Sequence, residues 1–146
     1  MLIDFQQGMA DLVASPALCN SVREGKGEAV LSARYRLTER EHRRLLAFAR
    51  DKGMQAACSV YRMNRITPLA INLRATLHAL GERLPGLMTK YWQAHPRGYS
   101  HFYIESDRFC GWLAAREEAL VPQVAEALCE EWALVRETLA ASLSET

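Results

Sequence analysis

The sequence has no long hydrophobic run, and this absence excludes a membrane-spanning helix. No apolar stretch in its 146 residues approaches the ~20 residues needed to cross a bilayer. The first residues also lack the basic start and continuous apolar region of a secretory signal, since Asp4 and Asp11 interrupt them. We therefore expect a cytoplasmic protein with no membrane partner.

Cysteine, histidine and glycine are too few and too scattered to form the common catalytic or metal-binding motifs. The four cysteines include no C-x-x-C pair, and the four histidines include no H-x-x-x-H pair. The eight glycines form no phosphate-binding loop, dinucleotide fingerprint or G-x-S-x-G turn. We expect reduced thiols, no metal, no cofactor and no catalytic residues. A catalytic site assembled from distant positions stays open, although no motif supports one.

Positive charge is concentrated in the middle of the chain. Residues 34–97 hold 13 Lys or Arg against 4 Asp or Glu, whereas residues 98–146 hold 3 against 9. The positive region either binds an anionic partner or is neutralised within the fold by the acidic region. The sequence leaves both alternatives open.

Apolar residues recur at helical spacing along most of the chain, as is typical of an all-α protein. Residues 2–14 predict an amphipathic helix, and the pair Thr38 and Glu41 predicts a capping box that starts a helix at Glu39. By contrast, the Pro, Asn, Ser and Gly residues between 15 and 27 predict a loop. The length and composition are those of one globular domain. We expect a single domain over 1–146, with 1–27 as a loosely attached N-terminal helix and hinge.

The most regular apolar stripe follows Thr67 and Pro68, which together read as the start of a helix. Its leucines are spaced at three or four residues, so this helix should be central to the core. Ser106 is a candidate N-cap for a later helix, and Pro122 lies near the start of the last one. Taken together, the expected helices predict a compact bundle of about six or seven helices. The stripe comprises Leu69, Leu73, Leu77, Leu80 and Leu84.

An ordered series of short motifs runs from residue 60 to residue 133. Most lie between Cys58 and Pro96, and Trp112-Leu113 follows. The series resembles the family of small proteins, named as DNA-binding domains, that accompany multinuclear non-heme iron oxidases in methanobactin-type ribosomal peptide (RiPP) maturation. The chain resembles a divergent or shortened member, since Met63, Leu84 and Arg97 depart from the family pattern. The motifs are Val60-Tyr61-Arg62-x-Asn64, Leu84-Pro85, Tyr91-x-x-x-His95-Pro96 and Glu131-Trp132-Ala133.

The resemblance implies a non-catalytic partner subunit without a cofactor. Such a subunit binds a cysteine-containing precursor peptide and scaffolds the oxidase. Tyrosine and tryptophan act as anchors at interfaces when partly exposed, and otherwise pack in the core. Arginines could pair with carboxylates of the peptide or of the oxidase. The residues expected to contact the peptide or the oxidase are Tyr61, Arg62, Arg65, Arg74, Tyr91, Trp92 and His95.

A DNA-binding regulatory protein that uses the basic region 34–65 is the alternative function. Arginines crowd one side of the helix expected after Thr38, and such clusters neutralise phosphates of nucleic acid. A charge run of this kind is also common on an ordinary solvated face. The residues expected to contact nucleic acid are Arg40, Arg43, Arg44 and Arg50.

Overall fold

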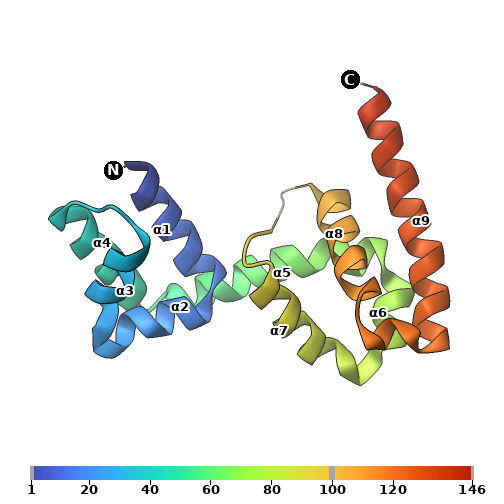
Figure 1. Cartoon of the computed structure of the whole chain (residues 1–146), viewed down its shortest axis with the longest axis horizontal. Helices are drawn as coiled ribbons and strands as arrows, with labels where there is room; N and C mark the ends of the chain where they lie inside the picture. Colours follow the sequence, from blue (N-terminus) through green and yellow to red (C-terminus); the bar gives the residue numbers. More distant parts are fainter. Residues whose placement is uncertain (1, 99–100, 146) are drawn as a thin grey trace. The chain divides into compact units, whose positions relative to one another are not determined.

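The computed structural model describes residues 2–98 and 101–145, and within these ranges it contains helices and no strand (Figure 1). The all-α prediction is therefore confirmed. The chain divides into two compact units, Met1–Met63 and Asn64–Thr146. The assignment of both to a single domain stays a prediction. Among the described helices, none combines the length and the apolar character that a membrane span requires.

Unit 1 is built from short helices around one hydrophobic core. Its elements are α1 (Leu2–Ala14), α2 (Pro16–Ser21), the kinked segment η1 (Val22–Lys26), α3 (Gly27–Arg34), α4 (Glu39–Arg50) and the first part of α5 (Met54–Asn72). Gly25 takes a φ of 87° in η1, a conformation that favours glycine. The buried core includes Leu12, Leu18, Cys19, Val22, Leu31, Tyr35, Leu45, Ala49, Met54 and Cys58.

Most of the segment between residues 15 and 27 is helical, so the prediction of a loop was wrong except at the kink formed by Glu24 and Gly25. Ser15 caps α2 by accepting a hydrogen bond from the Leu18 backbone N–H at 3.2 Å. Leu18 and Val22 then enter the unit 1 core. The turn-forming residues therefore mark the ends of short helices, because burial of the intervening apolar residues fixes the backbone as helix.

The predicted start of α4 is confirmed by its hydrogen bonds. The Thr38 hydroxyl accepts from the Glu41 backbone N–H at 3.2 Å, and the Glu41 carboxylate accepts from the Thr38 backbone N–H at 2.8 Å. This capping box satisfies two donors that a helix start leaves open. Leu45 and Ala49 face the core of unit 1 from this helix.

Helix α5 continues through Thr67 and Pro68, so the prediction of a helix start at this point was wrong. Pro68 lies inside α5, although an interior proline removes one backbone hydrogen bond. Both Pro68 and Leu69 are buried, and their packing offsets this loss. The break comes later, where Leu73 precedes the next helix.

Unit 2 consists of the end of α5 and the helices that follow it. These are α6 (Arg74–Leu80), η2 (Gly81–Arg83), α7 (Leu84–Ala94), α8 (Phe102–Ala114), η3 (Glu117–Leu120) and α9 (Pro122–Ser144). Ser106 is buried inside α8 rather than at its start, because its hydroxyl links α8 to α5 through Asn72 at 3.0 Å and the Pro68 carbonyl at 3.3 Å. The predicted leucine stripe does enter the core, with Leu69, Leu73 and Leu80 fully buried.

Helix α9 packs along α6 and α8 and is held there by polar contacts as well as apolar ones (Figure 1). The Glu131 carboxylate accepts backbone hydrogen bonds from Ala75 at 3.1 Å and Thr76 at 2.6 Å, and so satisfies open donors at the start of α6. The Trp132 indole N–H donates to Asp107 of α8 at 2.8 Å. Part of the C-terminal acidity is therefore used inside unit 2.

Candidate functional site

A buried ion pair lies at the centre of the motif-bearing part of unit 2. The Arg65 Nε atom of α5 is 2.7 Å from the Glu105 Oε1 atom of α8, and the two side chains are only 4% and 0% exposed. Arg65 also donates from Nη1 to the His95 backbone carbonyl at 2.6 Å. Because water solvates neither charge, each charge is stabilised mainly by its partner.

Tyr91 completes this network from α7. Its hydroxyl donates to the Glu105 Oε2 atom at 3.0 Å, so both carboxylate oxygens are occupied. Burial first, and then the Glu105 charge, raise the pKa of Tyr91, which keeps the phenol protonated as the donor. The Tyr91 ring also lies edge-on to Phe109 at 5.1 Å and to Trp112 at 5.4 Å between centroids.

Gly98 closes over the Arg65 side chain. A Cβ atom added at Gly98 would lie 2.7 Å from the Arg65 Nε atom and 2.8 Å from its Cγ atom. These atoms cannot move aside easily, since Arg65 is held at both Glu105 and His95. The Tyr91-x-x-x-His95-Pro96 motif and the glycine after it therefore surround one arginine.

Two of the predicted contact residues, Arg65 and Tyr91, are interior residues of unit 2. Tyr91 is 0% exposed and Arg65 is 4% exposed, so neither side chain lies on the surface. The carboxylate that pairs with Arg65 is Glu105 of the same chain. The structure thus assigns both residues to the stability of unit 2, the core role that the sequence left open for the tyrosine.

Glu105 was missed because residues 97–105 are aromatic and polar and predict a loop or short extended segment, whereas α8 begins at Phe102. The signal that could have found it is its spacing, since Glu105, Phe109 and Leu113 recur at four-residue steps on one face of α8. All three are fully buried. A lone carboxylate on an otherwise apolar helical face indicates an internal cation as its partner.

The remaining predicted contact residues are partly or fully accessible. Arg74 is exposed, and Tyr61, Arg62, Trp92 and His95 are half-buried. The His95 ring lies 5.2 Å from the Tyr91 ring. Burial first, and then the Arg108 and Arg65 charges, lower the pKa of His95, so its ring is neutral at neutral pH. The network thus brings His95 together with Arg65 and Tyr91.

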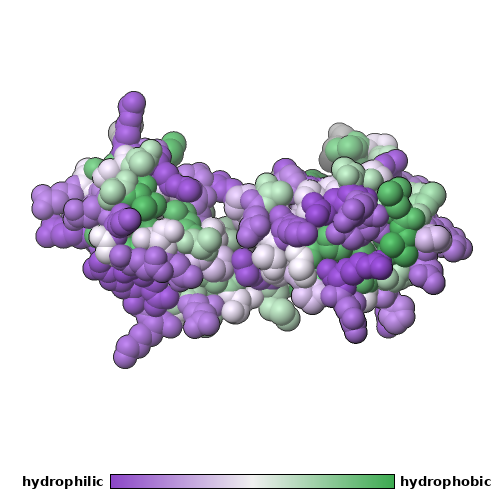
Figure 2. Space-filling view, turned by 60° about the horizontal axis from the view of Figure 1, so that its bottom comes forward, coloured by the Kyte–Doolittle hydropathy of each residue, from purple (hydrophilic) through white to green (hydrophobic). Residues whose placement is uncertain are grey.

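Helix α5 also carries large apolar side chains that remain in contact with solvent. Val60 is 60% exposed, Met63 is 63% exposed and Ile71 is 62% exposed. Apolar atoms reach the surface of both units among polar ones on the face drawn in Figure 2. Exposed apolar side chains of this kind suit contact with a protein or peptide.

The four arginines of the alternative nucleic-acid site are all exposed on α4. Arg40, Arg43 and Arg44 follow one another at steps of three and one, and Arg50 ends the helix. Leu45 and Ala49 point into the core of unit 1, so the arginines occupy the opposite, solvent-facing side. This arrangement permits several phosphate contacts from one helix.

Comparison with known proteins adds no family to this geometry. Across residues 2–98 and 101–145, no group of three or more His, Cys, Asp and Glu side chains is placed to hold a metal ion. The predicted contact residues that reach solvent lie on α5, on α6 and at the end of α7, and the four exposed arginines lie on α4. The chain matches no protein-family model, and neither a curated protein nor a solved structure matches it.

Proposed function

We propose that the chain is a cytoplasmic, non-catalytic partner protein that binds a cysteine-containing precursor peptide and scaffolds a multinuclear non-heme iron oxidase. The motif series from Val60 to Ala133 is what suggests this class of protein. The structural observation that supports it is the set of solvent-exposed apolar side chains on α5, with Met63 at 63% exposed. When a partner covers groups of this kind, the free energy of the complex falls, because apolar surface leaves water.

Each unit also carries an accessible arginine that can add specificity to partner binding. Arg74 at the start of α6 is exposed, and Arg62 on α5 is partly accessible. A guanidinium group binds carboxylates in a fork geometry, so an acidic leader peptide or an acidic patch of the oxidase is a matched partner. Apolar contact supplies affinity, and the arginines select the charge of the partner.

Co-expression of the tagged full chain with a multinuclear non-heme iron oxidase and its cysteine-containing precursor peptide tests this proposal. We expect the three chains to remain together through affinity capture and size-exclusion chromatography. Replacing Met63 with glutamate places a charge on the exposed apolar surface, and we expect the affinity for the partner to fall at least about 10-fold. Isothermal titration calorimetry with the purified partner measures this change.

Leu143→Glu is the matched control, because Leu143 of α9 is also an exposed apolar residue, at 76%. This variant should retain the wild-type affinity. The proposal fails when the wild-type chain captures neither the oxidase nor the peptide, or when the Met63 and Leu143 variants bind equally well.

The exposed arginines of α4 favour a second candidate, a DNA-binding regulatory protein. For this function we expect duplex DNA to bind with an affinity that falls as salt rises. Substituting Arg43 and Arg44 with alanine should reduce the slope of log affinity against log salt by about 2, which fluorescence anisotropy measures. An Arg83→Ala/Lys90→Ala variant removes two exposed charges from unit 2 and serves as the control. Equal slopes for both variants would exclude α4 as the DNA-binding helix.

A further inference from the structure

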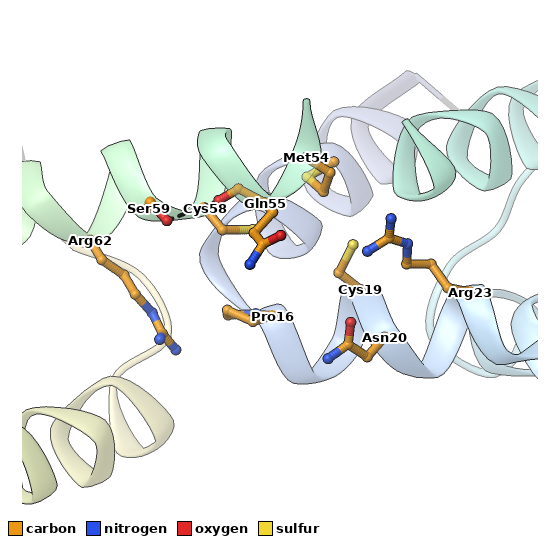
Figure 3. Close-up of a pocket in the computed structure, with 9 residues that line it drawn as sticks. All are labelled: Pro16, Cys19, Asn20, Arg23, Met54, Gln55, Cys58, Ser59 and Arg62. Carbon is orange, nitrogen blue, oxygen red and sulfur yellow. Dashed lines mark hydrogen bonds between the residues drawn. The ribbon is translucent and has the colours of Figure 1, made fainter. Parts of the chain in front are cut away.

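Unit 1 contains a cavity of about 350 Å³ between α2, η1 and the first part of α5. The Cys19 and Cys58 side chains point toward the same space from α2 and α5, and the Arg23 guanidinium lies close to Cys19 (Figure 3). A volume of this size accommodates a small organic molecule or one amino-acid side chain. The lining residues are Pro16, Cys19, Asn20, Arg23, Met54, Gln55, Cys58, Ser59 and Arg62.

The charge lining this cavity is positive and has no acidic counterpart there. Arg23 and Arg62 are the charged members of the lining, which includes neither Asp nor Glu. Within the part of the chain that the structure describes, Arg23 forms no ion pair with a carboxylate. A guanidinium group binds a planar anion through two parallel N–H donors, so an anionic ligand complements this lining.

The two thiols form part of the cavity wall and carry no charge that would offset Arg23. Cys19 donates to the Ala49 carbonyl at 3.4 Å, and Cys58 donates to the Leu12 carbonyl at 3.6 Å. Burial raises the pKa of both thiols, and their proximity raises the pKa of Cys19 further. Both are therefore neutral at physiological pH, and with Met54 and Pro16 they give the cavity an apolar, polarizable part.

Polar groups at the cavity complete the match to an anion that carries a short apolar stem. The side-chain amides of Asn20 and Gln55 supply N–H donors. The Ser59 hydroxyl donates to the Gln55 backbone carbonyl at 3.0 Å, so its proton is already used. The Arg23 guanidinium and the two amides supply donors for one carboxylate, while the sulfur-lined part suits its hydrocarbon stem.

From this lining we propose that the unit 1 cavity is a binding site for a carboxylate with a short apolar stem. The carboxylate can belong to a small free acid or to a glutamate side chain of a peptide. The site can be tested apart from the proposed partnership with an oxidase, because Arg23 lines the cavity and is not among the residues expected to contact the peptide or the oxidase. The partnership and the cavity site can therefore fail separately.

Titration of the ¹⁵N-labelled full chain with 4-methylpentanoate, followed by amide NMR spectra, tests the free-acid source. We expect saturable shifts of the Cys19 and Cys58 amides with a dissociation constant on the order of 1 mM. The neutral 4-methylpentanamide should bind at least about 10-fold more weakly, because it lacks the charge that Arg23 recognises. A second titration with acetyl-glutamate-amide, compared with acetyl-glutamine-amide, tests the peptide source.

Arg23→Gln should weaken carboxylate binding at least about 10-fold, whereas Arg40→Gln on α4 should leave it unchanged. Both arginines are exposed, so both variants should fold, and their circular dichroism spectra check this. Selective binding in either titration supports the proposal and identifies the source of the carboxylate. Absence of saturable shifts in both titrations, equal binding of acid and amide, or full affinity in the Arg23 variant would overturn it.

Discussion

Replacing Glu105 with alanine should lower the free energy of unfolding of unit 2 by about 3–5 kcal/mol. The change leaves the Arg65 guanidinium buried, at 4% exposure, without the carboxylate that compensates its charge. It also removes the acceptor of the Tyr91 hydroxyl. The loss combines an uncompensated charge with an unsatisfied buried donor, and either one alone is costly.

Urea unfolding followed by tryptophan fluorescence measures this loss in unit 2 itself, because Trp92, Trp112 and Trp132 all lie there. Glu126→Ala is the matched control, since Glu126 is an exposed acid on α9. Its effect should stay within about 0.5 kcal/mol. A loss below about 1 kcal/mol for Glu105→Ala would show that water solvates Arg65 in the native state.

A double-mutant cycle separates the ion pair from other effects of the substitution. Arg65→Met combined with Glu105→Leu removes both charges and keeps most of the side-chain volume. The double variant should be less destabilised than the sum of the two single variants by at least about 1 kcal/mol. Additive losses would show that Arg65 and Glu105 contribute independently.

The sequence predicts the helical class and several helix starts because those features depend on local interactions. The Thr38 and Glu41 capping box forms within four residues, and its hydrogen bonds are as expected. Segment 15–27 and Pro68 were interpreted wrongly, since in both cases buried contacts from distant parts of the chain outweigh local preference. The division into two units was not predicted, because no proline- or glycine-rich linker marks Met63 and Asn64.

The site could be predicted from the sequence only in part. The motif containing Tyr91 and His95 does gather around one centre, but that centre is the Arg65–Glu105 ion pair inside unit 2. A pattern of residue types does not show which side of a helix faces the core when arginine and tyrosine can occupy either side. The cavity near Cys19 and Cys58 joins residues 39 positions apart, so no local motif could reveal it.

Phe109→Ala should destabilise unit 2 by about 3–5 kcal/mol. Phe109 is 0% exposed, and its ring lies 5.1 Å from the Tyr91 centroid and 6.0 Å from the Trp112 centroid. Truncation removes the apolar surface that the ring buries and leaves a cavity between α7 and α8. Because Tyr91 is also the hydrogen-bond donor to Glu105, repacking of its ring would strain the ion-pair network as well.

Phe102→Ala on the same helix is the matched control, since Phe102 is 43% exposed and its ring is already partly solvated. Phe102→Ala should lower the free energy of unfolding by less than about 1 kcal/mol. Phe109→Leu should lower it by less than about 1.5 kcal/mol, because leucine refills most of the space. Urea unfolding followed by tryptophan fluorescence measures the free energy of unfolding of the three variants. Similar losses for Phe102→Ala and Phe109→Ala would show that α8 does not use this face for its core. If Phe109→Ala causes the largest loss of stability, the face of α8 that carries Phe109 is packed in the core. Glu105 lies one turn before Phe109 on that face, so its charge is buried in the same layer and must be compensated by Arg65.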